Sequence, residues 1–262
     1  MISPLALEIA TLDTWRAQDY EAKFGWRLLA SGGVTGRVNA VWPIGWTGEA
    51  SLEAAIAFSE NWYVRRGLRA CFKVAESASA PAGLSEALVA RGYLCHTPTL
   101  VMVRGSPTGA GEPRALPGAD GIEVALQSAP DGAFDLVFGA ASTTAADLAE
   151  RRGIVARTPP PRAYAVARSA GTPAAIGMVG VNEAGLAGLY AMRTVPAFRR
   201  RGLARAVVGA LAAYATAQGA HAIFLQVEAG NLAAIRLYEG LGFGTAYAYS
   251  YWHDPECPLA KP

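Results

Sequence analysis

The apolar residues in the second half of the chain repeat every two residues in some segments and every 3.6 residues in others. These periods are typical of strands and helices respectively. In chain order the pattern predicts strand 122–126, helices 131–141 and 145–155, strands 162–168, 174–182 and 186–195, helix 200–218, strand 222–227, helix 231–241 and strand 245–253. Strands followed by alternating strands and helices indicate an α/β fold, in which helices cover a mixed sheet.

The first part of the chain repeats the end of this order more weakly. Residues 67–93 align with residues 219–243, because each segment is predicted as a strand and a helix followed by a glycine and an aromatic residue. Such similarity is what a duplicated domain leaves behind. A glycine before an aromatic residue is also common by chance, because glycine ends helices and aromatic residues favour strands.

A segment without apolar periodicity separates the two parts. Residues 105–120 are rich in glycine and proline, which is typical of a linker. A chain of 262 residues is long for one mixed domain and suits two. We therefore expect an N-terminal domain at residues 1–104 and a C-terminal domain at residues 121–262.

Composition and charge narrow the function classes. Hydrophobic residues make up 52% of the chain and charged residues 17%, which excludes a disordered polymer. A net charge of +2 is too small for nucleic-acid binding over the whole surface, but it leaves room for one basic site aimed at an anionic ligand. We expect no nucleic-acid partner.

Neither a membrane segment nor a disulfide framework is predicted. Glu8 and Asp13 interrupt the N-terminal apolar stretch, and the longest apolar run, residues 206–217, is too short to cross a bilayer. The three cysteines, Cys71, Cys95 and Cys257, include no C-x-x-C pair. A cytoplasmic protein without disulfides and without a membrane partner fits this pattern best.

A metal site is not expected either. His96, His221 and His253 show no metal-ligand spacing. Cys95 and His96 are neighbours on a predicted strand, so their side chains point to opposite faces and do not form a nucleophile–base pair.

The segment 195–205 is the most distinctive in the chain. It is predicted as a strand end, a turn containing Arg199, Arg200 and Arg201, and the start of a long apolar helix. A helix N-terminus presents unpaired N–H groups and attracts phosphate, and Gly202 lets a ligand come close. Taken alone, the arginine run also fits a solvated basic turn.

Together with residues 231–243, this segment resembles the acetyl-CoA site of the GNAT (GCN5-related) N-acetyltransferase family. Residues 199–204 have the spacing R-x-x-G-x-A, similar to the family pattern Q/R-x-x-G-x-G/A, and residues 234–243 have the family-like spacing A-x-x-L-Y-x-x-x-G-F. The resemblance implies an acyl-CoA N-acyltransferase fold in two tandem GNAT-like domains, with acetyl-CoA as cosubstrate. The first domain is degenerate on this view, because residues 45–51, before its predicted helix 52–63, contain no arginine.

The resemblance also implies the site. Its cofactor-binding residues would be Arg193, Val195, Arg199, Arg200, Arg201, Gly202, Leu203, Ala204, Arg205, Asn231 and Tyr238. The backbone of Arg193 and Val195 would bond the pantetheine amides, as an added strand does, and the Val195 N–H would face the thioester oxygen. Tyr238 would protonate the departing thiolate.

Local structure offers simpler interpretations of two of these residues. Asn231 is among the best N-cap residues, and a tyrosine such as Tyr238 often packs in a core with a solvated hydroxyl. Seven residues separate the two, so they share roughly one face of a helix. Both can therefore reach one ligand.

The general base is not evident. Many family members carry a glutamate on the strand before the arginine turn, but residues 186–195 contain no carboxylate. Glu183, Glu228, Tyr190 and a chain of waters stay open as routes for the proton of the amine.

The leading hypothesis is acetyl transfer from acetyl-CoA to a primary amine by direct attack in a ternary complex. A non-catalytic acyl-CoA-binding or regulatory module is the alternative, and nucleic-acid binding through the arginines is a third. The acceptor, a small molecule or a peptide, is not identified. The N-terminal domain either walls the acceptor pocket or supports a homodimer, and residues 247–252 either pack as a strand or line that pocket.

Overall fold

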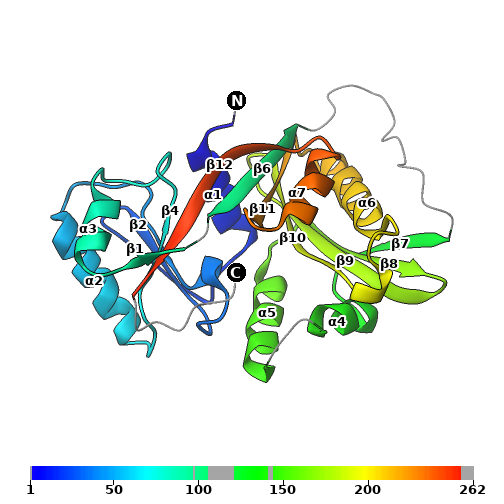
Figure 1. Ribbon diagram of the computed structural model, residues 1–262, viewed down its shortest axis with the longest axis horizontal. Coiled ribbons are helices and arrows are strands. Elements are labelled where there is room, and N and C mark those ends of the chain that lie inside the picture. Colours follow the sequence, from blue (N-terminus) through cyan, green and yellow to red (C-terminus); the bar gives the residue numbers. More distant parts are fainter. Residues whose placement is uncertain (1, 97, 106–120, 141–143, 255–262) are drawn as a thin grey trace.

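The computed structural model describes residues 2–96, 98–105, 121–140 and 144–254. Two lobes lie side by side and are joined through their sheets (Figure 1). The elements are α1 (Pro4–Thr14), β1 (Asp19–Lys23), β2 (Trp26–Ala30), β3 (Val41–Trp42), α2 (Leu52–Val64), β4 (Cys71–Val74), α3 (Leu84–Ala90), β5 (Leu94–Cys95), β6 (Thr99–Gly105), β7 (Ile122–Gln127), α4 (Gly132–Gly139), α5 (Ala145–Arg157), β8 (Arg162–Ser169), β9 (Thr172–Val181), β10 (Leu186–Thr194), α6 (Leu203–Ala217), β11 (Ala222–Glu228), α7 (Leu232–Glu239) and β12 (Gly244–His253). Short 3₁₀ helices lie at Gly36–Val38 and Pro196–Phe198.

One mixed sheet contains all the strands of the described ranges. Its order is β1-β2-β3-β4-β12-β6-β11-β10-β9-β8-β7, and β5 pairs with β12 outside this path. We call β1–β5 with α2 and α3 the N-terminal lobe, and β7–β11 with α4–α7 the C-terminal lobe. The expected mixed α/β fold is therefore confirmed.

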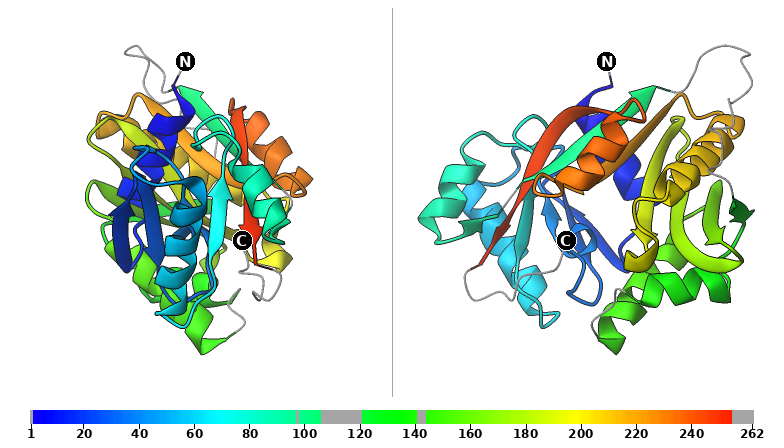
Figure 2. Two further views of the ribbon diagram at one scale, coloured as in Figure 1. Left: turned by 90° about the vertical axis from the view of Figure 1, so that its left-hand side faces the viewer. Right: turned by 45° about the vertical axis from the view of Figure 1, so that its right-hand side comes forward.

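Strands β6 and β12 cross between the lobes. β6 follows the N-terminal lobe in sequence but pairs with β11 of the C-terminal lobe from Thr99 to Gly105. β12 follows the C-terminal lobe and pairs first with β6 and then with β4. Figure 2 shows the two strands running together across the middle of the molecule. The lobes have thus exchanged their closing strands.

The last helices of the two lobes end in the same way. The amide of Tyr93 donates to Leu88 O at 3.0 Å after α3, and the amide of Phe243 donates to Tyr238 O at 3.0 Å after α7. In both caps the residue before the aromatic ring is a glycine with positive φ, which side chains with a Cβ rarely adopt. This shared cap supports the predicted internal repeat, in which Leu88 takes the place of Tyr238.

The elements expected in the C-terminal half are all present, and the largest difference at a boundary is at the start of α6. The helix predicted at 200–218 begins at Leu203, because Arg200 has φ 62° and Gly202 has φ 84°. Both values lie outside the right-handed helical region. The predicted linker at 105–120 falls, apart from Gly105 at the end of β6, outside the described residues.

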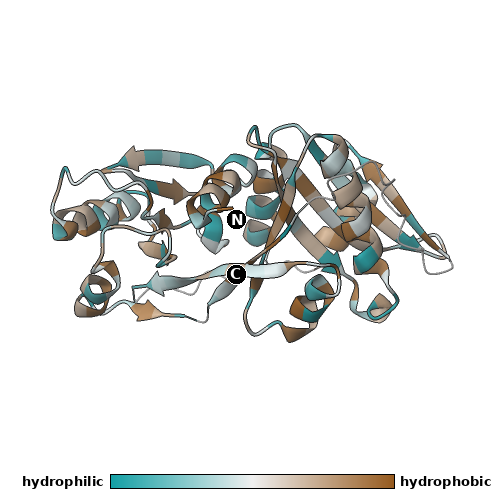
Figure 3. Cartoon of the chain, turned by 90° about the horizontal axis from the view of Figure 1, so that it is seen from above, coloured by the Kyte–Doolittle hydropathy of each residue, from teal (hydrophilic) through white to brown (hydrophobic). Residues whose placement is uncertain are grey.

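Three apolar clusters form the core. One lies between the sheet and α6 and α7, a second lies on the opposite face against α1, α4 and α5, and a third fills the N-terminal lobe. Figure 3 shows the strands of the C-terminal lobe as mostly apolar and the helices as mixed, as expected for elements with one solvated face. No helix in the described ranges is long and apolar enough to span a membrane.

The first helix belongs to the C-terminal lobe in space. α1 packs against β10, and the rings of Trp15 and Tyr190 stack with centroids 4.6 Å apart. The division into domains at residues 1–104 and 121–262 stays a prediction, and α1 and β6 are the parts of the first range that lie within the second lobe.

Candidate active site

The site begins where two parallel strands separate. β10 and β11 pair only from Leu186 to Leu189 and from Ala222 to Leu225, although β10 continues to Thr194 and β11 to Glu228. Backbone groups beyond the paired part lack a strand neighbour on that side. Such groups must find other partners, so the gap is suited to an extended ligand that adds to β10.

A bulge in β10 marks the start of this gap. Tyr190 is opposite Met178, and Arg193 is opposite Ile176. The two residues of β10 between them therefore lie opposite a single residue of β9, Gly177. Gly177 leaves the space that the bulge needs, because a Cβ there would lie within 2.4 Å of Met192 Sδ. Bulges redirect side chains and are frequent beside active sites.

The arginine turn presents a row of free amides. Among the described residues, none of the N–H groups from Arg200 to Arg205 donates a hydrogen bond within the chain. Arg199, Arg200 and Arg201 are exposed, and Gly202 supplies the left-handed N-cap of α6. Successive amides at a helix N-terminus bind phosphate groups. The geometry therefore has the form of the predicted pyrophosphate nest.

One predicted contact is wrong in the structure. The amide of Val195 donates to Ala174 O at 2.9 Å across the β9–β10 pair, so it does not face a thioester. Hydrogen-bonding groups alternate sides along a strand. By this alternation the backbone of Arg193, which is paired with Ile176, is turned to β9 as well, and the amide of Thr194 is turned toward the gap. The sequence pattern placed the strand correctly but did not show its register.

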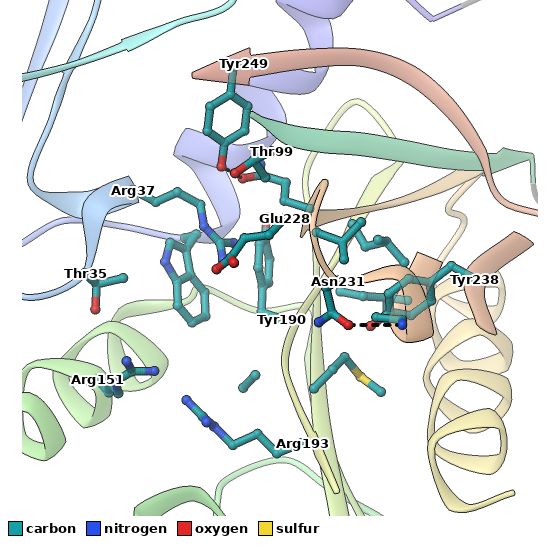
Figure 4. Close-up of a pocket in the computed structure, with 18 of the residues that line it drawn as sticks. Thr35, Arg37, Thr99, Arg151, Tyr190, Arg193, Glu228, Asn231, Tyr238 and Tyr249 are labelled. Carbon is teal, nitrogen blue, oxygen red and sulfur yellow. Dashed lines mark hydrogen bonds between the residues drawn. The ribbon is translucent and has the colours of Figure 1, made fainter. Parts of the chain in front are cut away.

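Helix α7 brings Asn231 and Tyr238 to the opposite side of the gap. Asn231 Oδ1 accepts from the Ala234 amide at 3.2 Å, which confirms the N-cap. Tyr238 packs edge-on against Phe243, and burial raises its pKa to about 12. Both side chains line one pocket with Arg193 (Figure 4). The N-cap and the packed ring are therefore present, and both residues also line the pocket.

The pocket itself has a volume of about 300 Å³, at the lower end of the range of small-molecule sites. One side is formed by β10, β11 and α7, with Met192, Asn231 and Tyr238. The other side is formed by residues that the sequence analysis did not single out, namely Trp15, Thr35, Arg37, Thr99, Phe138 and Arg151.

Aromatic residues of β12 line the pocket as well as packing the strand. Tyr249 and Tyr251 contribute to its wall, and Tyr249 donates to Gln226 Oε1 at 2.8 Å. Gln226 in turn donates to Thr11 Oγ1 at 3.0 Å. Residues 247–252 therefore lie on a packed strand, and Tyr249 and Tyr251 also line this pocket.

The N-terminal part walls the pocket through a loop held from the C-terminal lobe. Glu150 on α5 accepts hydrogen bonds from the amides of Val34 and Thr35, at 3.0 and 2.6 Å. This contact fixes the loop that carries Arg37. No local motif identifies Arg37 in the sequence, because its flanking glycine, valine and threonine residues are typical of any loop.

The groups that the sequence offers as acceptors of the amine proton occupy different positions in the structure. Glu228, at the end of β11, is the carboxylate among the pocket residues of the described ranges, and Figure 4 shows it between Arg37 and Asn231. Glu183 is exposed in the turn between β9 and β10. The Tyr190 hydroxyl lies 2.7 Å from Thr14 Oγ1, and burial raises the pKa of Tyr190.

The cysteines and histidines of the described ranges do not line this pocket. Over the described ranges no group of three metal-ligating side chains is present. Cys71 Sγ lies 3.7 Å from His253 Nε2, Cys95 is exposed, and Cys257 lies outside the described residues. The rings of His96 and His253, which are distant in sequence, pack at 4.8 Å.

Comparison with known proteins gives the family. Residues 5–252 match the family model described as probable histone acetyltransferase Rv0428c C-terminal. No curated protein matches the chain.

Solved structures share the fold. A GCN5-related N-acetyltransferase from Kribbella flavida has a TM-score of 0.72 and 18% identity, over 99% of each chain. A GCN5-related N-acetyltransferase from Sphaerobacter thermophilus has a TM-score of 0.62 and 15% identity, over 90% of this chain and 79% of that one. A tandem GNAT protein from the clavulanic acid biosynthesis pathway has a TM-score of 0.61 and 16% identity, over 79% and 70%. Because the family model spans nearly the whole described chain and these structures share its fold, the chain belongs to the GNAT N-acetyltransferase family.

Proposed function

We propose that the protein transfers the acetyl group of acetyl-CoA to a primary amine. The observation that carries the proposal is the gap between β10 and β11, because the free amides of the arginine turn, the pocket and Tyr238 all meet around it. Membership of the GNAT family supports acyl transfer in general. The donor, the acceptor class and the mechanism are the parts we infer.

The residues suit coenzyme A along its length. The amides from Arg200 to Arg205, with their exposed arginine side chains, would hold the pyrophosphate through charge-assisted hydrogen bonds. The amide of Thr194 would bond the pantetheine arm, and that of Met192, in the bulge of β10, would face the thioester oxygen. An N–H aimed at a developing oxyanion is a strong source of rate acceleration.

Acetyl transfer then needs one base and one acid. The amine gives a proton to Glu228 and its nitrogen attacks the thioester carbon. As the carbon–sulfur bond breaks, Tyr238 gives its proton to the departing thiolate, and the nitrogen, which carries one surplus proton after the attack, gives it to the Tyr238 phenolate. A pKa of about 12 keeps Tyr238 protonated at neutral pH, as an acid requires.

The acid is tested by Tyr238→Phe, measured as thiol release from acetyl-CoA with a panel of amines. We expect kcat to fall roughly 100-fold while KM for acetyl-CoA changes little, because the ring still packs on Phe243. The control is Tyr20→Phe, whose ring is 58% exposed on β1. Full turnover by Tyr238→Phe contradicts the assigned role, and cofactor binding without turnover in the unaltered protein favours a regulatory module.

The base is tested by Glu228→Gln over a range of pH. At pH 7 we expect kcat/KM to fall roughly 100-fold, and the loss should shrink with rising pH because an alkylamine, with a pKa near ~10.4, then deprotonates without help. Glu183→Gln is the matched control. A loss that is equal at every pH argues against Glu228 as base.

A further inference from the structure

The far side of the pocket from Tyr238 is rich in arginine. Arg37, Arg151 and Arg193 line it, and Figure 4 shows the three around one end of the cavity. Glu228 is the carboxylate that lines the same cavity in the described ranges. Arg151 is already paired with the buried Asp147, but the other two cations are not compensated in this way.

Neither Arg37 nor Arg193 has a carboxylate within ion-pairing distance among the described residues. Arg37 instead lies against aromatic rings, 5.6 Å from the centroid of Trp15 and 6.0 Å from that of Tyr190. The Nε of Arg193 is buried without a hydrogen-bond partner. Burial also lowers the pKa of Arg193, which is the direction that an unmet charge gives.

Two buried donors next to these cations are also unpartnered. Thr35 is 6% exposed and lines the pocket, and its hydroxyl has no hydrogen-bond partner in the described chain. The same is true of the indole Nε1 of Trp15, which is 7% exposed. Buried donors without partners are rare. Four donors that converge on one end of a pocket indicate an acceptor-rich ligand.

This end of the pocket is held rigidly. Glu150 binds the amides of Val34 and Thr35, and the amide nitrogen of Asn39 donates to both Glu150 oxygens at 3.3 Å. The loop with Thr35 and Arg37 is thereby fixed to α5, which carries Arg151. Preorganised donors reduce the entropy lost on binding.

We propose that the acceptor is a small amine that also carries an oxyanion, a carboxylate or a phosphate, which Arg37 and Arg193 bind with Thr35. The proposal rests on the proposed acetyl transfer and names its substrate class. The oxyanion sits at the arginine end and the amine points to Glu228 and the thioester. The family model is described as a probable histone acetyltransferase, and a lysine-rich peptide would place like charges beside these arginines.

The test compares acceptors that differ in one group. Thiol release from acetyl-CoA is measured with phenylalanine and phenylalaninamide, with phosphoethanolamine and ethanolamine, and with a lysine-rich peptide. We expect kcat/KM to be roughly 10-fold to 100-fold higher for the anionic member of at least one pair, and the pair that shows it distinguishes carboxylate from phosphate.

Substitutions test whether Arg37 and Arg193 produce the preference for anionic amines. Arg37→Gln and Arg193→Gln should each reduce the anionic-to-neutral ratio of kcat/KM at least about tenfold, and Arg37→Lys should reduce it less. Arg152→Gln is the control, because Arg152 is exposed on α5 and pairs with Asp135 at 3.2 Å outside the pocket. Calorimetry with acetyl-CoA verifies that each variant is folded and binds the cofactor.

The outcomes separate the two proposals. Equal use of anionic and neutral amines, or preference for the lysine-rich peptide, overturns the oxyanion proposal and leaves acetyl transfer in place. No turnover with any amine, despite acetyl-CoA binding, overturns the proposed function itself. A ratio that Arg37→Gln and Arg193→Gln leave unchanged also overturns the assigned residues.

Discussion

A buried ion pair connects α1 to the sheet. Lys73 on β4 is buried and pairs with the buried carboxylate of Glu8 on α1. Its ammonium lies 3.6 Å from the ring centroid of Trp42 and 4.0 Å from that of Tyr249, and the Tyr247 hydroxyl donates to Glu8. Burial lowers the pKa of Lys73 to about 8, against the opposing effect of Glu8.

We expect Glu8→Gln to reduce the free energy of unfolding by about 3 kcal/mol, because it leaves a buried cation without its counter-charge. Lys73→Met should do the same, and the double variant should lose less than the sum of the two. Denaturant unfolding of the three variants measures the coupling. Glu60→Gln is the control, since Glu60 pairs with Arg91 on the surface at 2.9 Å and should cost less than about 1 kcal/mol. Additive losses contradict the interpretation.

The sequence predicts some residues of the candidate site and not others. Asn231, Gly202 and Tyr238 could be predicted because the position of each is set by residues next to it in a helix cap, a turn or a helix. Arg37 and Thr35 are not, because their role comes from Glu150, more than a hundred positions away. The Val195 amide was misassigned because a bulge four residues earlier sets the hydrogen-bonding side.

At the level of elements, the turn between β10 and α6 has two left-handed residues, and only one is a glycine. Helical periodicity continues through the arginines and therefore predicts a start at residue 200. The positive φ values move the start to Leu203 and free the amides before it. The turn therefore gives up helical hydrogen bonds and leaves free the amides that we propose to hold the pyrophosphate.

Gly202→Ala tests this turn. We expect a loss of about 1–2 kcal/mol in stability, because φ 84° is strained for alanine, together with weaker binding of acetyl-CoA by calorimetry. Gly171→Ala is the matched control, since Gly171 has φ 78° in an exposed turn with open space around it. It should cost similar stability and leave the affinity unchanged. Equal affinity in both variants contradicts a cofactor role for the turn.

For the whole molecule, the exchange of β6 and β12 makes the lobes interdependent. A chain of residues 121–262 lacks β6, which covers one full edge of β11, and α1, which covers part of β10. Unpaired strand edges promote aggregation.

We therefore expect this fragment to be insoluble or unfolded by circular dichroism, and addition of residues 1–120 as a separate chain to restore the fold. The full chain should unfold in one transition by both fluorescence and circular dichroism. A stable, folded fragment contradicts this interdependence.

The order of elements and the family could be predicted from the sequence, because hydrophobic periodicity and the two motifs each depend on residues that are close together in the chain. The strand exchange was not, because a strand's partner is chosen by packing rather than by its own composition. The aligned Gly-aromatic caps indicate the internal repeat of the two lobes, but they do not show which strand pairs with which.

Strand β12 begins beside Tyr238, passes Tyr249 and Tyr251 in the pocket wall, and ends within the other lobe. A chimera that takes one lobe from a distant relative would therefore also place a foreign strand in the sheet of the other lobe. Substitutions in the pocket wall and in the N-terminal lobe are thus expected to be coupled through β12.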